Sequence, residues 1–216
     1  MGLKVLFWNI NGRGDSFVNK LLSVSQDVDI LLLAESKIDD SVIKENIKLD
    51  RVLFKSEFDE IELTPKLYSN IRPGVLEHYS NAPSKRLCFF TLQTKELGEI
   101  ILAGLHFPSK ATYNGETQLS FAANYSKWIR EIEKQRKHKK TLVFGDFNMN
   151  PFEEGMIQPQ AFNATLSAEV AKSGRRTSHY EKFDYFYNPM WNWLGDRAHH
   201  SGKKKLPGSF YYKTTS

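Results

Sequence analysis

Short apolar runs, each followed by polar residues, recur along the first 150 residues of this chain. Their β-branched, aromatic and other apolar residues predict strands over 3–8, 29–34, 86–94, 100–105 and 141–145. Apolar positions at helical spacing, with turn and capping signals, predict helices over 15–25, 38–49, 114–137 and 162–172. Beyond residue 172 we expect a loop-rich stretch. Strands that alternate with helices in this way are typical of an α/β (α+β) domain.

The polar residues that follow these runs are of kinds that carry chemistry. They are Asn9, Asn11, Glu35, His106, Asp146 and Asn148. In a layered α/β fold strand ends meet at one edge of a sheet, so residues far apart in sequence converge there. Taken singly, each has a plainer interpretation, such as an Asx turn at Asn9 and Asn11 or a solvated strand end at Glu35. Together they predict one functional site.

Four motifs carry these residues in a fixed order. They are Trp8-Asn9-Ile10-Asn11-Gly12, Ala34-Glu35-Ser36-Lys37, Leu105-His106-Phe107-Pro108 and Gly145-Asp146-Phe147-Asn148. In order and spacing over residues 3–150 they resemble the endonuclease/exonuclease/phosphatase superfamily, which includes DNase I and the exonuclease III type of enzyme. The resemblance implies a DNase I-like fold, a four-layer sandwich of two mixed β-sheets with flanking helices. We expect it to form a single domain over residues 1–216.

The resemblance also implies a metal site. Glu35 would bind a divalent ion, Mg²⁺ in the first place and Mn²⁺ as the alternative, and Asn11 stands where some relatives have an acid. Hard cations prefer carboxylate and amide oxygens, which these side chains offer.

Catalytic roles follow from the same resemblance. Asp146 would orient or deprotonate the attacking water, while Asn9, His106 and Asn148 would contact the phosphate. In-line cleavage of a phosphodiester needs an activated water, a cation and donors to the non-bridging oxygens, so the residue types agree with the chemistry. We further expect Asp146 and Asn148 to share one face of an extended segment.

The net charge of +5 is concentrated near the end of the sequence. Residues 172–216 hold nine Lys and Arg against three acids, interleaved with aromatic residues. Such a mixture suits a nucleic-acid surface, with a solvated loop as the alternative. The predicted substrate-binding residues are therefore Arg175, Arg176 and Trp191, together with Lys37 of the second motif. For Trp191 and Trp193 core packing is the alternative. His199-His200 and Lys203–Lys205 are interpreted as surface loops, with metal binding the alternative for the histidines and phosphate contact the alternative for the lysines.

Composition excludes several classes of protein. The single cysteine, Cys88, excludes an internal disulfide framework and a Cys-rich zinc site. The N-terminal apolar run is too short for a signal peptide, and no stretch approaches membrane-spanning length. We expect a cytoplasmic protein with no membrane partner.

One superfamily motif has no counterpart in the chain. Relatives end in Ser-Asp-His, whereas no Asp-His pair occurs in the 216 residues. The sequence is then part of a longer protein, is completed by a second chain, or is a member that binds without cleaving. Missing strands would leave an exposed apolar edge, so we expect residues 1–216 alone to be weakly active or inactive.

The sequence as a whole predicts a Mg²⁺-dependent phosphodiester hydrolase. Its basic, aromatic-rich segment favours a nuclease with DNA or RNA as partner. The alternatives are a phosphatase or phosphodiesterase acting on a small or lipid phosphoester, and an inactive nucleic-acid-binding member.

Overall fold

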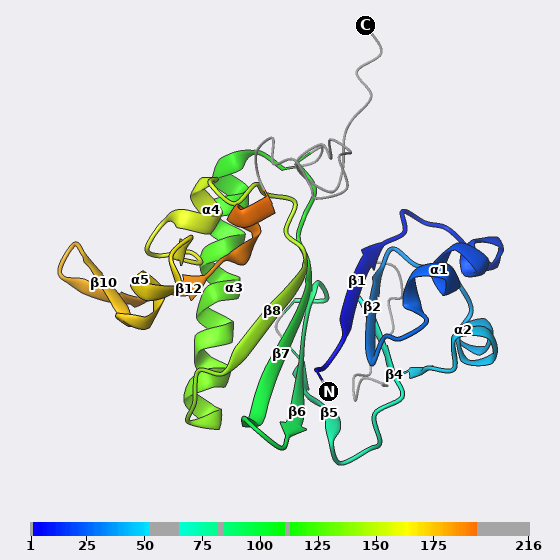
Figure 1. The fold of residues 1–216 in the computed structure, drawn as a ribbon. Coiled ribbons are helices and arrows are strands. Elements are labelled where there is room, and N and C mark those ends of the chain that lie inside the picture. The colour runs from blue at the N-terminus through cyan, green and yellow to red at the C-terminus, as the bar shows by residue number, and fades with distance from the viewer. Residues whose placement is uncertain (1, 52–64, 82–83, 111–112, 194–216) are drawn as a thin grey trace, which may run out of the picture. The chain divides into compact units, whose positions relative to one another are not determined.

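The computed structural model describes residues 2–51, 65–81, 84–110 and 113–193, which are drawn in colour in Figure 1. The chain divides into two compact units. The first comprises residues 1–114 and 127–148, and the second comprises 115–126 and 149–216. The single domain expected over residues 1–216 stays a prediction.

Two four-stranded sheets form the first unit. One has the order β1-β2-β4-β3, with β1 and β2 parallel and β4 antiparallel to β2. The other has the order β5-β6-β7-β8, in which only β7 and β8 run parallel. The strands are β1 (Val5–Asn9), β2 (Ile30–Ala34), β3 (Asp50–Arg51), β4 (Lys66–Ser69), β5 (Leu76–Asn81), β6 (Leu87–Thr94), β7 (Gly98–His106) and β8 (Thr141–Asp146).

Strand β2 links the two hydrophobic cores of this unit. Its even-numbered residues, Ile30 and Leu32, pack between the sheets with residues of β6 and β7. Its odd-numbered residues, Leu31 and Leu33, pack against helices α1 (Val18–Ser25) and α2 (Asp40–Ile47). Figure 1 shows both helices beside this sheet. Because successive side chains of a strand point to opposite faces, a strand buried on both faces is a continuous apolar run, as ILLLA of β2 is.

Helix α3 (Gly115–Arg136) begins in the second unit and ends in the first. In the first unit Ile129 and Ile132 are buried, and Glu133 accepts a hydrogen bond of 2.7 Å from the Thr141 hydroxyl. Helices α1 and α2, the two sheets and this part of α3 give the predicted four layers. A 3₁₀ turn, Asp15–Phe17, precedes α1. The strands and helices predicted up to residue 146 are all present, with ends shifted by at most two residues.

The second unit is built from short elements. They are α4 (Glu154–Ile157), β9 (Ala164–Thr165), α5 (Ala168–Lys172), β10 (Arg175–Ser178), β11 (Glu181–Asp184), β12 (Phe186–Tyr187) and a 3₁₀ turn, Pro189–Trp193. Strands β10 and β11 form an antiparallel hairpin, and β9 pairs with β12 in parallel. No helix in the described part of the chain is long and apolar enough to cross a membrane. The expected cytoplasmic location stays a prediction.

Two expectations for this unit are wrong. The helix predicted over 162–172 begins only at Ala168, because residues 164–165 pair with β12 and Ser167 caps the helix by accepting a hydrogen bond from the Val170 N–H. The stretch expected to be loop-rich contains the β10–β11 hairpin. Its strands, RRTS and EKFD, are short and largely polar, so they lack the alternation of apolar residues that predicts a strand.

Candidate functional site

Four strand ends of the first unit bring together four of the predicted residues. Asn9 ends β1, Glu35 follows β2, His106 ends β7 and Asp146 ends β8. The Asn9 Nδ2 donates to Glu35 Oε1 at 3.2 Å and to Asp146 Oδ2 at 3.1 Å. Glu35 Oε1 also lies 3.1 Å from His106 Nε2. Since both carboxylate oxygens lie beside the same nitrogen, the two acids face one centre, and we call these four residues the strand-end cluster.

The strand register explains this convergence. In the first sheet Asn9 is paired with Ala34, which places Glu35 one residue beyond the pair. In the second sheet His106 is paired directly with Asp146. Parallel strands present their carboxyl ends at the same edge of a sheet, so each sheet contributes two neighbouring polar side chains.

Glu35 has an uncommon backbone conformation. Its φ of +51° lies in the left-handed region, which costs an L-residue other than glycine roughly 1–2 kcal/mol. The Glu35 carbonyl accepts a 2.8 Å hydrogen bond from the Gly12 N–H, which ties the loop after β1 to the loop after β2. Strained backbone of this kind concentrates at functional sites, where the surrounding structure holds it in place.

Gly145 allows β8 to approach β7 closely enough to aim Asp146. Its φ is +148°, and a Cβ at this position would lie 1.9 Å from the Leu105 carbonyl oxygen. No larger residue fits without separating the two strands.

Asn148 does not lie on an extended segment with Asp146, so that expectation is wrong. The chain turns after β8, with Asn148 at a φ of +47° and its N–H donating to Asp146 Oδ1 at 2.9 Å. This is an Asx turn, in which an Asp side chain accepts a hydrogen bond from the N–H two residues later, and it replaces the expected extended segment. The Asn148 side chain donates from Nδ2 to the Phe107 carbonyl at 2.8 Å. The turn therefore fixes the Asp146 carboxylate.

Asn9 and Asn11 also form an Asx turn, as their structural interpretation predicted. The Asn11 N–H donates to Asn9 Oδ1 at 2.9 Å, and Asn11 is exposed with a φ of +51°. This bond leaves the Asn9 amide nitrogen facing the two carboxylates. Asn9 thus serves both the turn and the strand-end cluster, while metal binding by Asn11 stays a prediction.

The charge of the strand-end cluster suits a divalent cation. Among the described residues, neither Glu35 nor Asp146 forms an ion pair with Lys or Arg, and the His106 ring lies beside Glu35. Two neighbouring carboxylates repel each other, and a bound cation relieves this repulsion. No group of three or more His, Cys, Asp or Glu side chains in the described ranges is arranged to hold a metal. Mg²⁺, however, is commonly held by one or two carboxylates while it keeps several waters, so the residues fit this ion.

Two exposed cations lie on the loops that carry Asn9 and Glu35. The Arg13 guanidinium lies 5.0 Å from the Phe17 ring centroid, and that ring packs edge-on against Trp8. The Lys37 N–H donates to the Arg13 carbonyl at 3.0 Å. Within the described ranges neither side chain forms an ion pair. Arg13 was not predicted from the sequence, although its position next to the Asn-Gly pair of the first motif is a usable signal.

The remaining predicted substrate-binding residues lie in the second unit. Arg175 and Arg176 are both exposed, and Arg175 forms a 2.8 Å ion pair with Asp184. Trp191 is half-buried, with its ring 6.1 Å from that of Phe152. Its indole N–H is buried and has no hydrogen-bond partner in the described structure. The Trp193 side chain, His199-His200 and Lys203–Lys205 lie outside the described residues.

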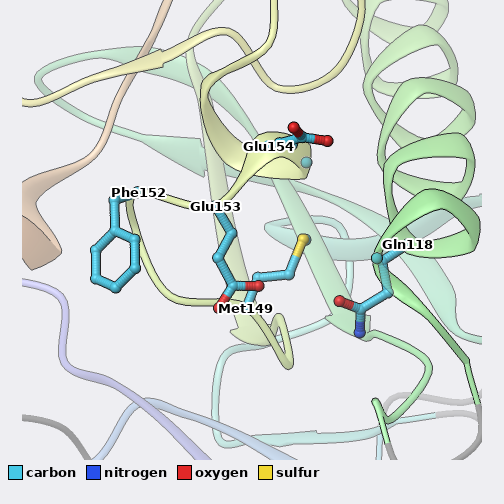
Figure 2. Close-up of a pocket in the computed structure, with 7 residues that line it drawn as sticks. Gln118, Met149, Phe152, Glu153 and Glu154 are labelled. Atoms are coloured by element: carbon cyan, nitrogen blue, oxygen red, sulfur yellow. The ribbon is translucent and has the colours of Figure 1, made fainter.

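A pocket of about 260 Å³ also lies in the second unit (Figure 2). Figure 2 shows Phe152 on one side and Gln118 of α3 on the other, with Met149 and Glu153 between them. The Glu153 carboxylate is used by the neighbouring loop, since it accepts bonds from the Asn150 N–H and side-chain amide at 3.0 and 2.7 Å. None of the predicted catalytic residues lines this pocket. The strand-end cluster is therefore the better candidate.

Two mixed sheets with outer helices define a DNase I-like fold, and the human Nocturnin catalytic domain shares this fold. Neither family models nor curated proteins match the chain. The human Nocturnin catalytic domain, a structure with a bound sulfate anion, has 18% sequence identity and a TM-score of 0.51, over 77% of this chain and 75% of that one. The endonuclease domain of TRAS1, a telomere-specific non-LTR retrotransposon, has 12% identity and a TM-score of 0.47, over 69% of this chain and only 60% of that one. The predicted fold is confirmed.

Proposed function

We propose that this protein is a divalent-metal-dependent phosphodiester hydrolase that acts on nucleic acid. The observation that carries the proposal is the single Asn9 amide shared by the Glu35 and Asp146 carboxylates, with His106 beside Glu35. Two carboxylates that face one centre and form no ion pair with a Lys or Arg of the described ranges are suited to a cation and a phosphate.

Each residue of the strand-end cluster has a role in this chemistry. Asp146 is held at one oxygen by the Asn148 N–H and at the other by Asn9, so its carboxylate is fixed to orient a water and accept its proton. As that water oxygen bonds to phosphorus, the bond to the leaving oxygen breaks. His106 is buried and presents Nε2 toward the same centre, where an N–H can donate to a phosphate oxygen. Mg²⁺ or Mn²⁺ held by Glu35 and Asp146 would supply neutralisation of the phosphate charge.

Nucleic acid is favoured over a small phosphoester by the cations around the site. Arg13 and Lys37 lie on the loops next to Asn9 and Glu35 and are exposed. A chain of phosphates offers partners to both side chains besides the phosphate that is cleaved. A small phosphoester offers fewer partners.

A side-by-side hydrolysis panel tests the proposal. Single-stranded RNA, duplex DNA and a small soluble phosphodiester are incubated with the full chain in Mg²⁺, in Mn²⁺ and in EDTA, with Asp146→Asn as the baseline. We expect metal-dependent product above that baseline, in the small amounts that the missing Ser-Asp-His motif predicts for residues 1–216 alone, with a nucleic acid as the best substrate.

Other outcomes of this panel contradict specific parts of the proposal. A small phosphoester as the best substrate overturns the nucleic-acid assignment. No product in any metal contradicts hydrolysis by this chain, and salt-dependent binding of nucleic acid in a separate binding measurement would then support the alternative of an inactive binding member. Product that is equal for the wild type and Asp146→Asn overturns the assignment of the strand-end cluster.

A further inference from the structure

The β10–β11 hairpin of the second unit presents two different faces. Its turn residues, His179 and Tyr180, both have positive φ, at +49° and +67°, as a two-residue hairpin turn requires. Arg176 is paired with Phe183 and Ser178 with Glu181, so these four side chains share one face. The opposite face carries Thr177, Lys182 and the Arg175–Asp184 ion pair.

The first face lines a depression of about 480 Å³ together with the segment 158–160 and the turn residue His179. This volume lies within the range of small-molecule binding sites. Its polar side chains make no hydrogen bond or ion pair with any described residue; they are Gln158, Gln160, Arg176, Ser178, His179 and Glu181. The depression thus combines unused donors and acceptors with two apolar lining residues, the half-buried Phe183 and the buried Pro159.

We propose that this depression binds one unstacked nucleotide of a single-stranded nucleic acid. The half-buried Phe183 ring provides apolar surface for a base, and aromatic–base stacking tolerates any sequence. Glu181 can accept from base amino groups, and the glutamine amides can both donate and accept. Arg176 supplies a charged donor for a phosphate or a base edge.

A single strand is the partner that matches this chemistry. A base in a duplex is stacked and paired, so it cannot enter a depression edge-first, whereas an unpaired base can. Tyr180 at the hairpin tip is fully exposed and gives a neighbouring base a second ring on which to stack. Binding here does not require hydrolysis at the strand-end cluster, so the inference goes beyond the proposed function.

Lys182 provides a matched control for Arg176. Both are exposed cations on the same hairpin without an ion pair in the described part of the chain, but they lie on opposite faces. Removal of either charge lowers the general attraction to a polyanion by a similar amount. A larger loss for Arg176 than for Lys182 therefore reports the depression itself.

The test is fluorescence anisotropy of a labelled single-stranded oligonucleotide with the full chain in EDTA, where hydrolysis makes no contribution. We expect Arg176→Gln to weaken binding about tenfold, and Lys182→Gln no more than about twofold. Tyr180→Ala, at a fully exposed position, is expected to weaken binding about fivefold. An oligonucleotide with abasic positions is expected to bind the wild type more weakly than the intact strand.

Three results would overturn the inference. Equal losses for Arg176→Gln and Lys182→Gln would leave only a general electrostatic surface. Equal binding of the abasic and intact strands would exclude recognition of a base. Tighter binding of duplex than of single strand would exclude an unstacked nucleotide. Because the hydrolysis panel uses a separate readout, its failure leaves this test intact.

Discussion

Carboxylates near the two ends of strand β7 have different kinds of partners. Near its first residue, Glu99 receives the Arg136 guanidinium on both oxygens, together with His138 Nε2 at 3.1 Å and the Gln93 amide at 3.0 Å. The Arg136 hydrogen bond foremost, followed by the His138 hydrogen bond and the charges of these two residues, lowers the pKa of Glu99 to about 2. At this end of the sheet the negative charge of Glu99 is therefore neutralised by a cation of the same chain.

At the other end of β7, the carboxylates of Glu35 and Asp146 have one shared amide, that of Asn9, and the His106 ring. Two acids here meet no Arg or Lys within the described residues, whereas one acid at the far end meets several donors. The difference between the two ends distinguishes carboxylates that stabilise the structure from carboxylates that are free to bind a cation. A carboxylate already neutralised by its own chain stabilises the structure, and acids left without a cation are suited to bind one from solution.

The largest effect is expected for Asp146→Asn. The asparagine keeps an oxygen that can accept from the Asn148 N–H, so the turn is retained, but it loses the proton acceptor. Hydrolysis is expected to fall about 10³-fold, typical of the loss of a general base. Metal-dependent product formation measures this effect, and an unchanged circular dichroism spectrum is the control. Near-normal turnover with this variant would remove Asp146 from the mechanism.

Glu35→Gln should separate activity from stability. Loss of one metal-binding carboxylate is expected to lower hydrolysis about 100-fold and to weaken Mg²⁺ binding measured by calorimetry. Without metal, the melting temperature should stay equal or rise, because one of two neighbouring like charges is gone. A clear fall in melting temperature would show that Glu35 is a structural acid like Glu99.

Glu99→Gln should give the reverse pattern. Hydrogen bonds to charged groups contribute roughly 1.5–3 kcal/mol, and the unfolding free energy is expected to fall by about this amount. Because the folded pKa of about 2 lies below the ordinary value of 4.5, the stabilisation is complete above pH 4.5 and is lost as pH falls toward 2. Urea unfolding of both proteins between pH 7 and pH 3 checks this, with hydrolysis at neutral pH as the control. Parallel stability curves with no convergence at low pH would contradict the role of Glu99.

The sequence predicted those parts of the fold that follow from local pattern. The apolar run after Asp29 predicts a strand buried on both faces, as it is in the structure. The polar residues that follow such strands lie together in the strand-end cluster. What it did not predict depends on distant partners or on backbone angles. Residues 164–165 are a strand only because residues 186–187 pair with them.

The same reasoning applies to the geometry of the candidate site. The residue types at the strand ends were visible, but the left-handed conformation of Glu35 and the Asx turn after Asp146 were not. The stacking of Arg13 on Phe17 also depends on a turn whose shape is set by hydrogen bonds between two loops. Local sequence pattern therefore predicts which residues lie at the site, and tertiary contacts determine how their side chains are oriented.

The smallest effect is expected for Arg13, an exposed cation on the loop that follows Asn9. Arg13→Ala is expected to raise the KM for a nucleic-acid substrate about fivefold with little change in kcat, because the lost contact is to a phosphate outside the reacting centre. Lys20→Ala, which removes an exposed cation on α1, is the matched control and should change KM less than about twofold. Arg13→Lys should not restore the wild-type value, since a lysine cannot stack its charge as a plane on the Phe17 ring. Equal effects at Arg13 and Lys20 would mean that the loop adds only general positive charge, and the contrast between the two ends of β7 would then rest on the carboxylates alone.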